Sequence, residues 1–473
     1  MNNDRYRYLF PYEKIKPNTN ILIYGAGIVG MEYLKQILIT HYCNVIGLVD
    51  KNYKEYASFK VPVFSPDEIS KLEIDYVVIA VSTGRNVNEI KKVLFSQGID
   101  EDKIVCIFTR EDDVSVYGNN DSMEISQTLA YQRSNISLAL LLSGGIGDMV
   151  MNKRFVEEII RFVPNILIDI YYANSGDFLK YLYSDCDNVN IVIPNLGTRY
   201  AIKCSEYTIG IEVAALRYVH VDIFKKERFE ILNKEFVVKV CKLMEESKKE
   251  DFNLNTLNYV ILGRRLYNGY NAYTRFNYNG AFDIKDKNVH IPLTQESEKY
   301  FRNLELGKYI TINCGNGVNG DGSSVSKAWP HEYYEEFAIL FKKKYTTINL
   351  VQIGDDNITK INGADRYLLG EDFGVVSHVL KNSIFHFDIE GGLVHIAFQL
   401  GTKCVVLFGP TSKEYFGYDN NINICAGTCH NCYGLYKNQY KCARNMSEPE
   451  CMYSITPELV MKHVDSYMES IGY

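Results

Sequence analysis

The sequence predicts an α/β protein with three sheet-containing units, and two observations support this prediction. Apolar runs of strand length alternate with segments in which apolar residues recur every three to four positions, as on one face of a helix. Glycine-rich turns join a strand to a helix at residues 25–30, 144–147 and 390–392. Strand–helix units repeated in this way predict parallel, doubly wound sheets covered by helices. The 473 residues allow about three domains of ~150 residues each.

The first unit, residues 1–125, is predicted to be a Rossmann-like nucleotide-binding domain. We expect its strands at 20–24, 44–50, 75–81 and 103–108, and a helix at 31–40. Gly25, Gly27 and Gly30 form the turn before this helix, and Asp50 ends the second strand. This pattern is the dinucleotide fingerprint, in which the acid binds a ribose hydroxyl. The turn fits a nucleotide, NAD or CoA, but the same glycines also serve a tight turn that holds no ligand.

Two further α/β units follow a polar, aperiodic stretch at residues 110–135, which we interpret as a linker. The second unit covers residues 134–300 and the third covers residues 301–473. Their clearest elements are strands at 137–142, 167–172, 310–313, 384–387 and 405–408, and helices ending at Val163 or spanning 236–246, 393–400 and 455–471. The region from about 195 to 300 is otherwise harder to assign.

The turn at the start of the second unit carries a candidate catalytic acid. Gly145 and Gly147 would let a substrate approach the backbone closely. Asp148 lies on the first helical turn, where it is either a catalytic acid or a carboxylate stabilised only by the helix dipole. Two nucleotide-type turns downstream favour the catalytic role.

Two segments of the third unit are suited to a diphosphate. A loop rich in glycine and serine follows a strand and ends at Lys327, although a flexible surface loop would have the same composition. At Glu390, Gly391 and Gly392 a strand turns into a helix, and His395 lies on the first turn of that helix. Free backbone N–H groups and the helix dipole at such a turn attract an anion, typically a phosphate.

Five of the twelve cysteines crowd into residues 425–451. Four of them have the spacing of a tetrahedral metal site: Cys429, Cys432, Cys442 and Cys451. Thiolate ligands fit a structural Zn or Fe ion alike. Reduced thiols and disulfides are the alternatives, and the absence of a signal sequence disfavours disulfides.

Charge and hydropathy exclude several classes of protein. The net charge of −7 argues against a general nucleic-acid surface. No apolar run approaches the ~20 residues needed to span a bilayer. The N-terminal segment has no signal-peptide core, so we expect a cytoplasmic protein. The oligomeric state stays open between a monomer and a homo-oligomer.

Residues 136–465 resemble glycosyltransferase family 9, the ADP-heptose heptosyltransferases. The resemblance depends on four motifs in the right order: Gly147-Asp148, Ser326 to Pro330, Glu390 to Ala397 with Leu407 to Thr411, and a cysteine cluster closing at Cys451-Met452 before Ile455 to Pro457. The Gly-Gly-Leu-Val-His run looks like the branch that modifies bacterial autotransporters, which carries an iron-binding cysteine finger. Glu390 departs from the aspartate usual in the family. Residues 1–125 look like nucleotide- or CoA-binding domains found beside sugar-modifying enzymes.

The resemblance implies a GT-B-like pair of Rossmann-like halves, preceded by a separate Rossmann-like domain. It also implies inverting transfer of a sugar, with heptose from an ADP-sugar as the first expectation, to a glycan or protein hydroxyl. Asp148 would act as the general base. The implied substrate site contains Gly145, Gly147, Lys327, Glu390, Gly391, Gly392, His395 and Thr411. The alternatives are an NAD(P)-dependent oxidoreductase or sugar-nucleotide epimerase that uses residues 20–130, and a non-catalytic nucleotide-sensing subunit.

Overall fold

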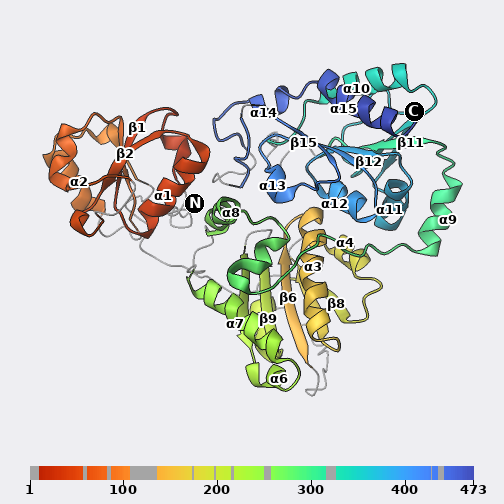
Figure 1. The fold of residues 1–473 in the computed structure, drawn as a ribbon, viewed down its shortest axis with the longest axis horizontal. Coiled ribbons are helices and arrows are strands. Elements are labelled where there is room, and N and C mark those ends of the chain that lie inside the picture. Colours follow the sequence, from red (N-terminus) through yellow and green to blue (C-terminus); the bar gives the residue numbers. More distant parts are fainter. Residues whose placement is uncertain are drawn as a thin grey trace.

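Three separate sheets organise the chain in the computed structural model (Figure 1). The structure describes residues 10–56, 61–81, 87–106, 136–172, 175–195, 199–214, 218–249, 257–315, 326–427, 429–434 and 441–473. The linker predicted at 110–135 therefore lies outside the described residues.

The N-terminal unit has a five-stranded parallel sheet in the order β3-β2-β1-β4-β5. Its elements are β1 (Asn20–Tyr24), α1 (Ile28–Thr40), β2 (Asn44–Val49), β3 (Val63–Phe64), β4 (Tyr76–Ile79), α2 (Val87–Ser96) and β5 (Ile104–Val105). This is the strand order of a Rossmann sheet. Helix α1 begins three residues earlier than expected, because the glycine turn ends at Gly27 and the chain is already helical at Ile28.

The second sheet has the order β10-β9-β6-β7-β8. Its elements are β6 (Ser137–Ser143), α3 (Ile146–Phe162), β7 (Leu167–Tyr172), α4 (Gly176–Leu182), β8 (Val189–Pro194), α5 (Arg199–Lys203), β9 (Ile209–Ala214), β10 (Tyr218–Phe224), α6 (Lys226–Glu230) and α7 (Lys234–Lys249). Strand β10 is antiparallel to β9. Only three residues separate these two strands, too few for the crossover that a parallel pair requires.

The third sheet is parallel throughout, in the order β13-β12-β11-β14-β15-β16. Its elements are β11 (Tyr309–Ile312), α10 (His331–Lys344), β12 (Asn349–Gly354), β13 (Arg366–Leu369), α11 (Phe373–Lys381), β14 (His386–Ile389), α12 (Gly392–Gln399), β15 (Cys404–Phe408), α13 (Lys413–Phe416), β16 (Ile422–Cys425), α14 (Glu450–Tyr453) and α15 (Pro457–Ser470). The expected α/β class and paired Rossmann-like halves are confirmed.

The strand orders explain where the sites lie. In each sheet the order reverses beside the first strand, between β1 and β4, between β6 and β9, and between β11 and β14. Open α/β sheets bind ligands at the carboxyl ends of the strands next to this reversal. The glycine turns after β1, β6 and β14 all lie at such ends.

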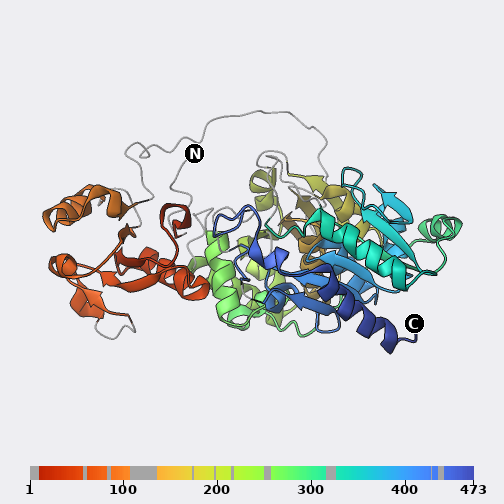
Figure 2. The ribbon, with the colours of Figure 1, turned by 90° about the horizontal axis from the view of Figure 1, so that it is seen from above.

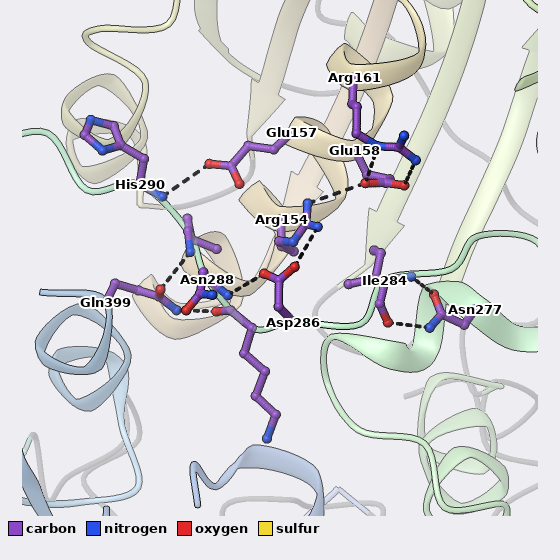
Figure 3. A network of polar contacts seen from close by, with 12 residues as sticks. Arg154, Glu157, Glu158, Arg161, Asn277, Ile284, Asp286, Asn288, His290 and Gln399 are labelled. Atoms are coloured by element: carbon purple, nitrogen blue, oxygen red, sulfur yellow. Dashed lines mark hydrogen bonds and ion pairs between the residues drawn. The ribbon is translucent and has the colours of Figure 1, made fainter. Parts of the chain in front are cut away.

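Residues 257–303 connect the two C-terminal sheets through α8 (Leu257–Tyr267), a 3-10 helix η8 (Thr274–Gly280) and α9 (Gln295–Asn303). Part of this connection, residues 281–294, runs as a strap between α3 and α12 (Figure 3). From α3, Glu157 accepts the His290 N–H at 3.3 Å and Arg154 pairs with Asp286 at 3.3 Å. From α12, the Gln399 amide oxygen accepts the Val289 N–H at 2.7 Å. The strap therefore ties α3 and α12, the two helices that follow the glycine turns, to each other.

Helix α8 lies between the N-terminal unit and the rest of the molecule (Figures 1 and 2). It packs against α1. Among the described residues, no helix has the length and apolarity needed to cross a membrane.

Candidate active site

The glycine turns of the second and third units meet at one cavity of about 800 Å³. Helices α3 and α12 begin side by side there. A Cβ atom on Gly147 would lie 2.5 Å from Cδ2 of His395, and one on Gly392 would lie 2.8 Å from Cβ of Ile146. Both distances are shorter than real Cβ contacts, so these two glycines permit the close approach of the helices.

Eight of the nine residues proposed for the donor and acceptor chemistry line this cavity. They are Gly145, Gly147, Asp148, Lys327, Glu390, Gly391, Gly392 and His395. Thr411 does not line this cavity; its side chain is buried, and its hydroxyl has no hydrogen-bond partner among the described residues. Its predicted role in substrate binding therefore has no contact with the cavity to support it.

Asp148 lies on the first turn of helix α3. Its Oδ2 atom accepts the backbone N–H of Gly145 at 2.7 Å, which closes the first turn of the helix. Gly144 has φ +127°, and a Cβ there would lie 2.4 Å from the Asp148 carboxyl carbon. Only glycine fits this position, because both the backbone angle and the carboxylate exclude a side chain. The turn therefore aims a half-buried carboxylate into the cavity.

Arg275 contacts helix α3 one turn after Asp148, and sequence reasoning missed it. This residue of η8 is buried, and its guanidinium donates a hydrogen bond to the Asn152 side chain of α3. Burial lowers the pKa of Arg275, while Tyr415 and the Asp148 carboxylate partly oppose that fall. Arg275 therefore adds positive charge next to the candidate base. No local sequence pattern predicts a role for Arg275, because it lies in a segment that is rich in Tyr and Asn and has no periodicity.

Lys327 and Glu390 form a partly buried ion pair on the donor side of the cavity. The Lys327 ammonium donates to the Glu390 backbone oxygen at 2.8 Å and lies 3.2 Å from its Oε2 atom. Burial alone would raise the pKa of Glu390, but Lys327 and His395 outweigh burial and lower that pKa to about 2. For Lys327, burial opposes the charged form, yet Glu390 and Tyr433 raise its pKa above the ordinary value. Both groups are therefore charged at neutral pH.

His395 is oriented by a chain of buried hydroxyl groups. Its Nε2 atom lies 3.3 Å from Glu390 Oε1 and its Nδ1 atom lies 2.7 Å from the Tyr418 hydroxyl. The Tyr418 hydroxyl lies 2.7 Å from that of Tyr273, which accepts an amide hydrogen of Gln399 at 3.2 Å. Burial raises the pKa of Tyr418, so it keeps its proton and can donate to Nδ1. Nε2 then carries the hydrogen that faces Glu390.

Tyr433 and Leu262 complete the cavity from the cysteine segment and from α8. The Lys327 ammonium lies 5.2 Å from the centre of the Tyr433 ring, a distance at which a cation is attracted to the ring face. The sequence did not point to either residue, because a lone Tyr beside a cysteine and a lone Leu on a helix match no motif.

The glycine turn of the N-terminal unit is a separate feature. Gly25 has φ +118°, and a Cβ on Gly30 would lie 1.8 Å from the Gly25 oxygen, so both glycines are required by the turn itself. A Cβ on Gly27 would meet nothing within 4 Å. The Asp50 carboxylate accepts the Ala26 N–H at 2.9 Å, so it supports the turn. Binding of a nucleotide, NAD or CoA at these residues stays a prediction.

All twelve cysteines are free thiols. The thiols of Cys429 and Cys451 are hydrogen-bonded; this bond, with Arg444, lowers the pKa of Cys429 to about 6. The same hydrogen bond and burial raise the pKa of Cys451, and thiolates at Cys432 and Cys442 would raise it further. Four interacting thiols suit the chemistry of Zn or Fe. However, within the described part of the chain no three His, Cys, Asp or Glu side chains are arranged to hold an ion. Metal binding here stays a prediction.

Comparisons with known proteins follow this division of the chain. Residues 17–105 match the model of a family described as C2185-like, N-terminal. No curated protein matches the chain.

Solved structures similar to this chain cover about seven-tenths of it. The iron-containing dodecameric glycosyltransferase TibC of enterotoxigenic Escherichia coli H10407 is 13% identical with a TM-score of 0.50, over 71% of this chain and 79% of TibC. The E. coli ADP-heptose lipopolysaccharide heptosyltransferase II is 15% identical with a TM-score of 0.45, over 72% of this chain and all of that enzyme.

A glycosyltransferase of family 9 from Veillonella parvula is 14% identical with a TM-score of 0.42, over 71% of this chain and 98% of that one. At these identities the similarity concerns the fold. The two C-terminal sheets of this chain therefore share the GT-B fold of the glycosyltransferase TibC.

Proposed function

We propose that the protein is an inverting glycosyltransferase that moves a sugar from a nucleoside-diphosphate sugar to a hydroxyl acceptor. One observation carries the proposal: a single cavity joins Asp148 from the second unit to Lys327, Glu390 and His395 from the third. The shared GT-B fold and the ordered family 9 motifs support the same activity. The motifs make ADP-heptose the first donor to test, and a glycan or a protein Ser/Thr the first acceptor.

In the proposed reaction, Asp148 removes the proton of the acceptor hydroxyl as its oxygen attacks the anomeric carbon. The bond from that carbon to the diphosphate oxygen breaks on the opposite face, so the configuration inverts. The half-buried carboxylate is already oriented by the Gly145 N–H, which limits the reorganisation needed for proton transfer.

The leaving diphosphate gains negative charge as the bond breaks. Lys327 and the free N–H groups at the start of α12 face this charge in the cavity. His395 offers its Nε2 hydrogen on the same side. Lys327 is paired with Glu390, so a bound diphosphate would either share Lys327 with Glu390 or take the place of Glu390. The Glu390 carboxylate is then free to accept a hydrogen bond from a hydroxyl of the donor.

The decisive experiment replaces Asp148 by Asn, which keeps the shape and removes the base. We expect transfer to fall by about 10²- to 10⁴-fold while ADP still binds. Asp187→Asn, at an exposed turn before β8, is the matched control and should behave as wild type. Mass spectrometry of acceptors incubated with ADP-, GDP-, UDP- and CMP-sugars measures the product. Transfer by Asp148→Asn at the wild-type rate would remove Asp148 from the mechanism.

Two finer features belong to this proposal. TibC is described as iron-containing and dodecameric. We infer that Cys429, Cys432, Cys442 and Cys451 hold a structural Zn or Fe ion and that the chain assembles as a homo-oligomer in the cytoplasm. The spacing of these four cysteines and the hydrogen bond between the Cys429 and Cys451 thiols support the metal.

A further inference from the structure

We propose that the N-terminal unit positions the wall of the active-site cavity, and that Glu32 does this through Arg264 and helix α8. The inference rests on the proposed transferase function for its kinetic consequence. It assigns a role to a unit that lies outside the transferase halves.

The first step is the contact between the units. Glu32 lies on α1 and is only 3% exposed, although it is a carboxylate on a surface helix of its own unit. The Arg264 side chain of α8 covers it, with Nε donating to Oε1 at 3.1 Å. Lys35, one turn further along α1, contacts the same oxygen at 3.0 Å. A carboxylate buried in this way depends on its partners, because without them its desolvation is not compensated.

The second step is the opposite side of α8. Successive residues of a helix are rotated by about 100°, so Leu262 points about 200° away from Arg264. Leu262 lines the active-site cavity. Its Cδ2 atom also lies 2.4 Å from the position of a Cβ on Gly434, so it packs directly on the cysteine segment. One face of α8 therefore contacts the N-terminal unit while the other forms cavity wall.

The third step leads from α8 to the charged groups. Gly434 follows Tyr433, whose ring lies under the Lys327 ammonium. The Tyr433 N–H donates to the Pro410 oxygen at 2.8 Å, which fixes the backbone at this point. A shift of Leu262 would therefore act on the ring that supports Lys327.

A second path from α8 leads to the candidate base. The Arg265 guanidinium stacks on the Tyr278 ring at 3.5 Å. Tyr278 and Arg275 belong to the same 3-10 helix, η8, and the Arg275 guanidinium donates to the Asn152 side chain on α3, one turn after Asp148. Helix α8 thus contacts Gly434, which follows the ring under Lys327, and Tyr278, which lies in the same 3-10 helix as Arg275. Breaking the Glu32–Arg264 pair should release α8 and weaken binding of the nucleotide in the cavity.

The test exchanges the two charges. We compare Glu32→Arg, Arg264→Glu and the double exchange with wild type in the full chain. The matched control is Lys91→Glu with Glu101→Lys, a surface pair of the same unit whose charged atoms lie 3.5 Å apart. Lys91 belongs to α2, which lies on the side of that unit away from α8 (Figure 1). Three quantities are measured: ADP affinity by calorimetry, hydrogen exchange of residues 257–267 by mass spectrometry, and KM for the donor against kcat.

Each single substitution should speed amide hydrogen exchange of α8. It should also weaken ADP binding by about five-fold or more, the lower end of measured coupling between sites. KM for the donor should rise more than kcat falls. The double exchange should recover most of both losses, since it restores the pair in the opposite direction. The control pair should change neither quantity.

Faster amide hydrogen exchange of α8 with unchanged ADP affinity and KM would overturn the proposal. The N-terminal unit would then be attached to α8 without affecting the cavity. Unchanged exchange of α8 would overturn it as well. If a charge exchange prevents folding, Arg264→Gln removes the charge with less repulsion and is judged by the same outcomes. ADP affinity and hydrogen exchange need no turnover, so failure of the transferase assignment is distinguishable from failure of this coupling.

Discussion

Charged residues that are buried and paired decide the chemistry of this cavity. Glu390 is 6% exposed and meets Lys327 and His395 within 3.3 Å. Its pKa of about 2 means that the carboxylate stays ionised across the physiological range. The extra methylene relative to the aspartate usual in family 9 gives it the reach to contact both partners at once.

The pairing of Glu390 predicts a specific pH dependence of stability. Since the folded pKa of about 2 lies below the ordinary 4.5, the ionised group stabilises the fold above pH 4.5, and this is lost as pH falls towards 2. A fall of pKa from 4.5 to about 2 corresponds to roughly 3 kcal/mol. Urea unfolding should show wild type more stable than Glu390→Gln at pH 6, with the gap closing by pH 2. A gap that persists at pH 2 would contradict the pairing. Glu227→Gln, at an exposed position, is the control.

Tyr418 carries a second prediction for a single side chain. Tyr418→Phe removes the hydroxyl that donates to His395 and leaves the buried hydroxyl of Tyr273 short of a partner. We expect a loss of about 1–3 kcal/mol in the free energy of unfolding, the cost of an unsatisfied buried polar group. We also expect lower kcat/KM, because the His395 tautomer is no longer fixed. Tyr300→Phe, at a ring that is 49% exposed, should change neither quantity. Equal effects of the two substitutions would show that the hydroxyl chain does not orient His395.

Two helices, α3 and α12, bring the halves of the site together. Each begins at a glycine turn at the reversal of strand order, and the strap at residues 281–294 ties both. Their close approach is possible because Gly147 and Gly392 carry no side chain.

This contact predicts that Gly147→Ala is destabilising although alanine is the better helix former. Elsewhere in a helix the change would stabilise by about 1 kcal/mol. Here the new Cβ would lie 2.5 Å from His395, which is held by Tyr418 and Glu390 and cannot retreat. We expect a net loss of about 1–3 kcal/mol and weaker ADP binding. Thermal unfolding and calorimetry measure both. Gly427→Ala has no atom within 4 Å of its Cβ and serves as control. A stabilised Gly147→Ala would mean that α3 and α12 are further apart.

At the scale of the whole chain, a metal would connect the cysteine segment with two other regions. The segment contacts α8 through Gly434 and lines the cavity through Tyr433. Elemental analysis of anaerobically purified protein should find about one Zn or Fe per chain. Cys432→Ser with Cys442→Ser should lose that metal and lower the melting temperature, while Cys186→Ser should keep both. Neither metal in the wild-type protein would refute the site.

Much of the fold was predictable because its signals are local. Strands β1, β6, β7 and β15, the closing helix and the glycine turns were all found close to their observed bounds, since each shows a clear period or a breaker residue. Strand β10 and helix α8 were missed. The first is an antiparallel edge strand beside a short connection, and the second lies in the region from about 195 to 300, where no clear alternation of strand and helix signals could be assigned.

The sequence alone determined the α/β class, the three glycine turns and the motif residues from Asp148 to His395, because periodicity and turn chemistry are written in neighbouring residues. Only the tertiary structure decided which turns face each other. It excluded Thr411 from the cavity lining and gave Asp50 a role in its own turn. It also brought Arg275, Tyr418, Tyr433 and Leu262 to the site and placed Glu32 against Arg264. These contacts join residues far apart in the chain, and packing between elements fixes them where no local pattern can.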